Sequence, residues 1–167
     1  GVDIAGYTKI LKTNFRNTVQ IHEFAERYRT GCSSQNFDIE NESNAFRMGP
    51  APEIFEDNSE DTLLNILFDR IKLLLKTLFY TPSNIAIISP NNDDVEKFKP
   101  IAKELDINIK QIKDRTYDFE DENSLRFSTF HSAKGLDFPV VLLFLPDLER
   151  LFTHNSYEDE VRNKIKD

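Results

Sequence analysis

Residues 84–89 read NIAIIS, a short apolar run that follows a Thr-Pro-Ser break at 81–83. A run that is apolar almost throughout, rather than at alternate residues, is typical of a strand buried on both faces of a parallel sheet. Residues 125–129 (LRFST) and 139–145 (PVVLLFL) read as two more strands, and the second is apolar enough to predict complete burial. These runs predict a mostly parallel sheet at the centre of the fold.

Helical patterns alternate with these strands. After Ser59, which can cap a helix, residues 60–79 carry leucine and isoleucine at helical spacing. Residues 93–105 show the same spacing, but Pro100 lacks a backbone donor, which predicts a kink or a break. Strands that alternate with helices indicate an α/β fold with helices on both faces of the sheet.

The amino-terminal part is expected to begin with a strand at residues 8–13, followed by a helix over 18–29. Asn17 or Thr18 can cap that helix and Gly31 can end it. The other expected pieces are extended segments at 45–48 and 53–55, a strand at 108–112, polar connections at 32–43 and 114–123, and a helix that starts at Ser156.

Composition limits the class of protein. The chain has 167 residues, of which 39% are hydrophobic, and 21 basic against 29 acidic side chains give a net charge of −8. This apolar share excludes disorder of the whole chain, and the single cysteine, Cys32, excludes an internal disulfide scaffold. No apolar run approaches the roughly 20 residues of a membrane span, and residues 1–7 do not resemble a secretory signal. We therefore expect a cytoplasmic protein that has no membrane partner and forms a single domain over residues 1–167.

Several common sites are missing from the sequence. Neither a GxxxxGK[ST] phosphate loop nor a GxGxxG motif is present, and His22, His131 and His154 lie too far apart for zinc spacing. We expect no zinc or other metal site. The acidic charge also argues against a freestanding nucleic-acid binder.

One segment carries groups that can contact phosphate. Residues 129–138 read TFHSAKGLDF between two expected strands, and ligands of parallel sheets gather at the carboxyl ends of strands. The polar side chains expected there are Thr129, His131, Lys134 and Asp137. Gly135 allows a backbone conformation, or a close ligand approach, that a side chain would block. An ordinary turn with a solvated lysine is the alternative.

A second segment, residues 14–17 (NFRN), places Arg16 between the first expected strand and the first expected helix. A guanidinium group there can bind an anion through two parallel hydrogen bonds. A surface arginine without a ligand is the alternative.

Together these segments resemble a known family. Residues 11–25 (LKTNFRNTVQIHEFA) resemble motif IV of superfamily 1 helicases of the UvrD/Rep/PcrA type, in which Asn-Tyr-Arg-Ser/Thr leads into a helix. Residues 129–141 (TFHSAKGLDFPVV) resemble motif V of the same family. Residues 84–94 resemble the strand between these motifs, and residues 148–154 resemble the stretch after motif V.

The resemblance implies the second RecA-like domain, called 2A, of an ATP-dependent DNA helicase. The implied fold is a RecA-like (P-loop NTPase-like) sheet with helices on both faces and without a Walker A loop. The expected domain has no 2B insertion, ends before motif VI and is inactive alone. Its implied partners are the N-terminal RecA-like domain of the same polypeptide and single-stranded DNA. ATP with Mg²⁺ would be bound mainly by that first domain.

The resemblance also implies roles for single residues. Arg16 matches the motif IV arginine that approaches the γ-phosphate across the interdomain cleft. Gly135 and Asp137 match positions near the nucleotide, although relatives usually have Glu where Asp137 stands. The positions implied to contact the DNA strand are Thr129, His131, Lys134 and Asn92.

Two other readings stay open. A degenerate helicase-like module that serves as a protein-interaction or scaffold domain fits the acidic charge, Asp137, and the presence of Pro90 where relatives often have Arg. An unrelated α/β binding domain is the third reading. Intact Arg16 and residues 129–135 favour the motor domain.

Overall fold

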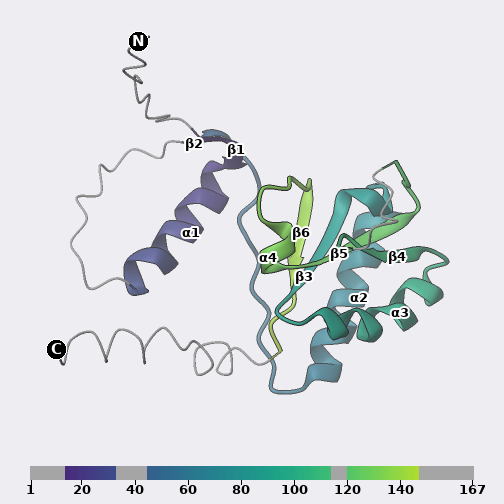
Figure 1. Ribbon diagram of the computed structural model, residues 1–167. Helices are drawn as coiled ribbons and strands as arrows, with labels where there is room; N and C mark the ends of the chain where they lie inside the picture. The colour runs from purple at the N-terminus through teal and green to yellow at the C-terminus, as the bar shows by residue number, and fades with distance from the viewer. Residues whose placement is uncertain (1–13, 33–44, 114–119, 147–167) are drawn as a thin grey trace, which may run out of the picture. The chain divides into compact units, whose positions relative to one another are not determined.

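The computed structural model describes residues 14–32, 45–113 and 120–146. The chain divides into two compact units, with the boundary after Ile54 (Figure 1). Each unit is described by itself. The expected strand at 8–13, most of the connections at 32–43 and 114–123, and the expected helix from Ser156 lie outside the described residues.

The first unit contains β1 (Asn14–Thr18), α1 (Val19–Cys32) and β2 (Ala45–Arg47). The two strands pair in parallel, and β1 includes the segment that the sequence placed between a strand and a helix. Thr18 is the cap, because the Ile21 N–H donates to Thr18 Oγ1 at 3.3 Å. The helix passes through Gly31, so the prediction that this glycine ends it is wrong.

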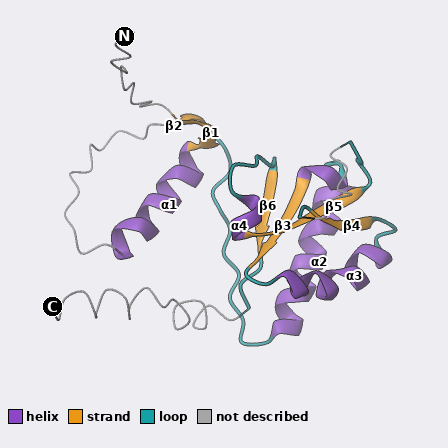
Figure 2. Cartoon of the chain, viewed as in Figure 1, coloured by secondary structure: helices purple, strands orange, loops and turns teal. Residues whose placement is uncertain are grey.

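The second unit is a four-stranded, all-parallel sheet with helices, which confirms the α/β class (Figure 2). Its strand order is β4-β5-β3-β6. The strands are β3 (Ile85–Ser89), β4 (Asn108–Gln111), β5 (Ser124–Thr129) and β6 (Val140–Leu143). The helices are α2 (Glu60–Lys76), α3 (Val95–Glu104) and α4 (Phe130–Ala133), with short 3₁₀ turns η1 (Pro82–Asn84) and η2 (Asn92–Asp94). Residues 53–55 form no strand.

The hydrophobic core lies on one face of this sheet. Alternate residues of the central strands, such as Ile87 and Phe127, pack against α2 and α3. Ile71 of α2 and Phe98 of α3 are fully buried there. The Phe98 ring meets the Phe127 ring at 5.8 Å and the edge of the Phe144 ring at 5.2 Å. These aromatic contacts fix the position of α3 relative to β5 and to the end of β6.

The two long helices of this unit agree with the sequence in part: α2 begins where expected but ends earlier, and α3 is not broken at Pro100. Ser59 caps α2 as expected, because the Thr62 N–H donates to Ser59 Oγ at 3.3 Å. The helix ends at Lys76, three residues before the expected end, and Phe79 then takes a left-handed backbone conformation with φ 55°. α3 continues past Pro100 without a break. Pro100 and Glu96, whose carbonyl loses its helical partner, both lie on the exposed side, where water can solvate that carbonyl.

The prediction of complete burial is correct for β3 and wrong for β6. Every residue of β3 is buried, whereas Val141 and Leu143 of β6 are 45% and 56% exposed. β6 is one of the two edge strands among the described strands of this sheet, and these two residues lie on the sheet face opposite to α2 and α3. Among the described elements of this unit, only the short helix α4 lies on that second face, so the helical cover of the two faces is unequal (Figure 1). In the described ranges, no helix combines the length and apolarity that a bilayer crossing needs.

Candidate functional site

The carboxyl ends of β3 and β5 lie side by side, and Ser89 pairs with Thr129 in their parallel ladder. The connection from β3 to β4 passes across β5, and the connection from β5 to β6 passes across β3. These two connections run in opposite directions along the sheet, and in α/β sheets ligands bind outside the carboxyl ends of such strands. We call this region the carboxyl edge; it comprises Ser89, Asn92, Asp94, Gln111, Thr129 and His131.

A buried hydroxyl–carboxylate pair holds the loop that follows β3. Ser89, fully buried, donates a hydrogen bond from Oγ to Oδ2 of Asp94, which is only 6% exposed. Burial on its own would raise the pKa of Asp94, but the Ser89 hydrogen bond and the Lys97 ammonium outweigh it, so the pKa lies below its ordinary value. Asp94 is therefore ionised at neutral pH, and its charge fixes the turn η2 against the end of β3.

Lys97 connects this pair to α2. Its ammonium group lies 3.1 Å from Asp94 and 2.6 Å from Glu60, and it sits 5.9 Å from the centre of the Phe144 ring. Desolvation would lower the pKa of Lys97, but the hydrogen bonds and charges of the two carboxylates raise it above its ordinary value. The start of α3 is thus tied both to β3 and to the first turn of α2.

Asn92, an implied DNA contact, lies exposed in η2 and receives two hydrogen bonds from Gln111 at the end of β4. Gln111 Nε2 donates to Asn92 Oδ1 at 2.9 Å and to the Asn92 backbone carbonyl at 3.4 Å. These bonds cross over the end of β5, which lies between β4 and β3. Asn92 is therefore held at the carboxyl edge beside Thr129.

The segment after β5 forms a helical turn and then a β-turn. Thr129 ends β5 and its Oγ1 donates to Ser132 Oγ at 3.3 Å, while His131 and Lys134 are exposed. Lys134 (φ −58°, ψ 123°) and Gly135 (φ 87°) are the central residues of a type II turn closed by the Leu136 N–H to Ala133 carbonyl bond of 3.0 Å. The positive φ explains the glycine, which confirms the first of the two roles expected for Gly135.

The expectation that Asp137 lies at the carboxyl end is wrong. Because β6 is parallel to β5, the chain must return to the opposite end of the sheet before β6 begins. Asp137 is exposed there and lines a hollow of about 200 Å³ with Ser83, Asn84 and Arg126. Arg126 and Thr129 lie three residues apart on one strand, which separates the two ends by about 10 Å.

Arg16 lies in the middle of β1, in the first unit. Its side chain is outside the part of the chain that the structure describes. The structure thus brings Asn92 and Thr129 together at one edge, with His131 and Lys134 in the segment that follows, and it does not relate Arg16 to them.

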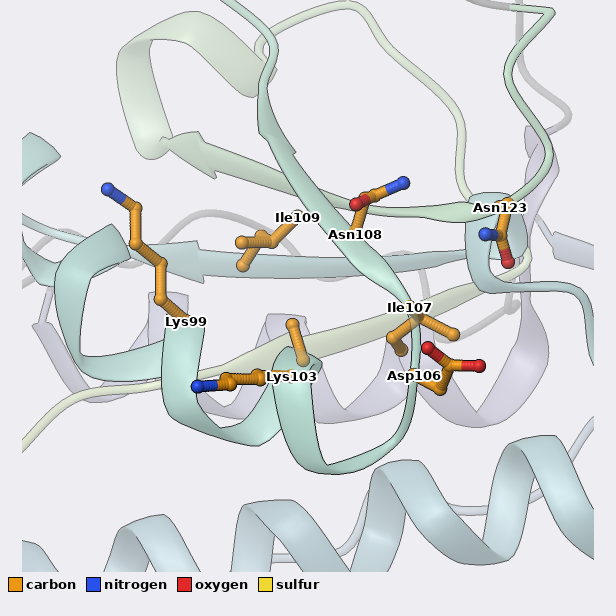
Figure 3. A pocket seen from close by; sticks show the side chains of 8 residues that line it. Lys99, Lys103, Asp106, Ile107, Asn108, Ile109 and Asn123 are labelled. Carbon is orange, nitrogen blue, oxygen red and sulfur yellow. The ribbon is translucent and has the colours of Figure 1, made fainter.

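A larger hollow of about 510 Å³ lies elsewhere, between the end of α3 and the start of β4 (Figure 3). Lys99 and Lys103 line one side, and their ammonium groups point away from Asp106 and Asn123 on the other side. Lys99 also pairs with Glu96 at 2.5 Å. Charged groups that do not converge give no defined position for a ligand. Within the described ranges, His, Cys, Asp and Glu side chains form no group of three that could hold a metal ion.

Sequence reasoning missed the residues that support the carboxyl edge: Ser89, Asp94, Lys97 and Gln111. A polar residue at the end of a buried strand, followed by an acidic residue at the next helix start, was a usable signal for Ser89 and Asp94. Gln111 left no local signal, since its partner lies 19 residues away.

Comparisons with known proteins do not decide between the readings. Neither the protein-family models, nor the curated proteins, nor the solved structures contained a match to this chain. The functional argument therefore depends on the motifs and on the geometry of the carboxyl edge.

Proposed function

We propose that this chain is the second RecA-like domain of an ATP-dependent superfamily 1 DNA helicase. The observation that carries the proposal is the position of the motif V-like segment. It starts at Thr129, the last residue of a central parallel strand whose connection runs opposite to that of the neighbouring strand β3. Ligands of α/β sheets bind at such points. The second motif V-like feature is the glycine turn at Gly135.

On the DNA side, the carboxyl edge offers hydrogen-bond donors to a phosphate backbone. Asn92 and His131 are exposed, Thr129 is half-buried, and Lys134 is exposed in the turn that follows. Amide, imidazole, ammonium and hydroxyl groups are the types that contact nucleic-acid phosphates. With a net charge of −8, the chain contributes little long-range attraction, so the first domain would supply most of the strand affinity.

On the nucleotide side, this chain would contribute one positively charged group, the Arg16 guanidinium. Bound ATP supplies the phosphoryl group that passes to water, and the Arg16 guanidinium would neutralise negative charge that develops on it. Gly135 needs its turn conformation whether or not nucleotide is present, and Asp137 faces the opposite end of the sheet from Thr129. We therefore assign neither of them to the nucleotide.

The test uses the complete polypeptide that contains this chain. Arg16→Ala should lower DNA-stimulated ATP turnover by about 10³-fold or more while nucleotide binding stays mostly intact. Arg16→Lys keeps the charge but not the planar fork, and it should restore little of the rate. Arg70→Ala, an arginine that stacks on Phe55, is the matched control and should retain turnover. Wild-type turnover in Arg16→Ala would contradict the proposed role of Arg16.

A degenerate, helicase-like scaffold domain is the second candidate. The exposed apolar side chains of Phe130, Val141 and Leu143 favour it, because such groups are typical of protein-binding surfaces. This candidate predicts that the complete polypeptide shows no DNA-stimulated ATP turnover, so the same assay separates the two functions.

A further inference from the structure

The hydrogen bonds between Gln111 and Asn92 determine which way the Asn92 carboxamide faces. A carboxamide has one acceptor oxygen and one amino group with two donor hydrogens. Gln111 Nε2 reaches the Asn92 Oδ1 atom at 2.9 Å, so the oxygen of Asn92 faces β4. The Asn92 amino group must then face away from β4, and it makes no hydrogen bond within the described ranges.

The backbone of Asn92 is held by the same side chain. The 3.4 Å bond from Gln111 Nε2 to the Asn92 carbonyl ties the first residue of η2 to the end of β4. The buried Ser89–Asp94 pair anchors the other end of this turn. Residue 92 therefore presents two N–H donors from a turn that is fixed at both ends.

An anion binds to hydrogen-bond donors of the protein and is repelled by hydrogen-bond acceptors. A carboxamide that turned its oxygen outward would repel a phosphate, whereas the observed orientation offers both N–H groups to it. Asp93, next in the chain and exposed, opposes an anion with its own carboxylate. The orientation of Asn92 is therefore expected to decide whether this turn attracts or repels a phosphodiester.

We infer that Gln111 is a positioning residue that orients the Asn92 carboxamide toward a phosphate of the bound single strand. This inference rests on the proposed function, because it takes the carboxyl edge as the strand-binding surface. It adds a residue that lies 19 positions away from Asn92 and belongs to neither motif.

The experiment measures binding of a fluorescein-labelled dT20 oligonucleotide to the whole chain by fluorescence anisotropy at low salt. Gln111→Met keeps the length and neutrality of the side chain but removes the donor. It should weaken binding about fivefold, the effect of losing one oriented hydrogen bond. Asn108→Leu removes an amide from the other end of the same strand and should leave the affinity within twofold of wild type.

A double-mutant comparison separates positioning from damage to the fold. Asn92→Ala should weaken binding by a similar factor, and Gln111→Met should then have no further effect in the Asn92→Ala background. An equal loss from Gln111→Met in both backgrounds would overturn the inference, because Gln111 would then act without Asn92. Wild-type binding by Gln111→Met alone would overturn the inference and leave the proposed function standing. Absence of any dT20 binding by the wild-type chain would also overturn the inference, whereas the proposed function is tested separately by ATP turnover of Arg16→Ala in the complete polypeptide.

Discussion

Replacing Asp94 with alanine removes the acceptor of a hydroxyl that water cannot reach. Ser89 is fully buried and donates to the Asp94 carboxylate, which in turn pairs with Lys97 at 3.1 Å. Asp94→Ala therefore leaves the Ser89 hydroxyl without a partner and frees η2 from the end of β3.

The size of the effect follows from these two contacts. A buried hydrogen bond to a charged group contributes about 1.5–3 kcal/mol. The Lys97 ion pair adds only about 0.5 kcal/mol, because the Lys97 side chain is 34% exposed and keeps Glu60 as a partner. We expect Asp94→Ala to lower the free energy of unfolding by about 3 kcal/mol. Asp94→Asn keeps an acceptor for Ser89 and should cost about 1 kcal/mol.

Urea unfolding followed by circular dichroism measures these differences. With a slope of about 2 kcal/mol per molar urea, the midpoint of Asp94→Ala should fall by about 1.5 M. Asp93→Ala, at the neighbouring exposed carboxylate, is the control and should shift the free energy by less than about 0.5 kcal/mol. A midpoint for Asp94→Ala equal to that of Asp93→Ala would refute the reasoning.

The pH dependence gives a second check on Asp94. Its folded-state pKa lies below the ordinary value of 3.8. The stabilisation is therefore fully present above pH 3.8 and is lost as pH falls through the folded-state pKa. The difference in stability between wild type and Asp94→Asn should be constant near neutral pH and shrink in acid. A difference that grows in acid would contradict the assignment.

Three further predictions concern turns and the amino end of the sheet. Phe79→Gly should stabilise the chain by about 0.5 kcal/mol in thermal unfolding, because Phe79 has φ 55° and a side chain that is 83% exposed, so relief of backbone strain exceeds the entropy cost of glycine. Gly135→Ala should destabilise by about 1–2 kcal/mol in the same assay, because alanine at φ 87° is strained even though the space around it is open. The hydrogen bond from Lys110, followed by those from Ser124 and the Asn123 N–H, lowers the pKa of Asp121 to about 2. The thermal midpoint of wild type should therefore exceed that of Asp121→Asn above pH 4. The difference between the two midpoints should close between pH 4 and 2.

The α/β class was predictable because the decisive signals are local. The continuous apolar run of β3, the Ser59 cap and the helical spacing after it each depend on neighbouring residues, and each prediction was confirmed. The run of β6 looks the same in sequence but is half-exposed. In the described sheet β6 is an edge strand, and that place depends on the strand order, which the run itself does not encode. Burial of a strand on both faces is a property of its neighbours as much as of its own residues.

The residues of the candidate site that a single strand positions were predictable from the sequence. The residues that depend on how several strands are arranged were not. Thr129 is the last residue of β5 and Asn92 lies three residues after the end of β3, so their position at the carboxyl edge follows from a parallel sheet. Asp137 was misplaced because eight residues are enough for the chain to return to the other end of the sheet. Gln111 was missed because only the strand order brings it across β5 to Asn92.

The central claim is that the carboxyl edge contacts a single strand, and backbone amide shifts in a ¹⁵N-labelled chain titrated with dT12 test it most directly. The account predicts that the largest shifts fall on Asn92, Thr129, His131 and Lys134 and decrease as salt is added. Shifts confined to Lys99 and Lys103 at the hollow beside α3, or no shifts at low salt, would contradict it.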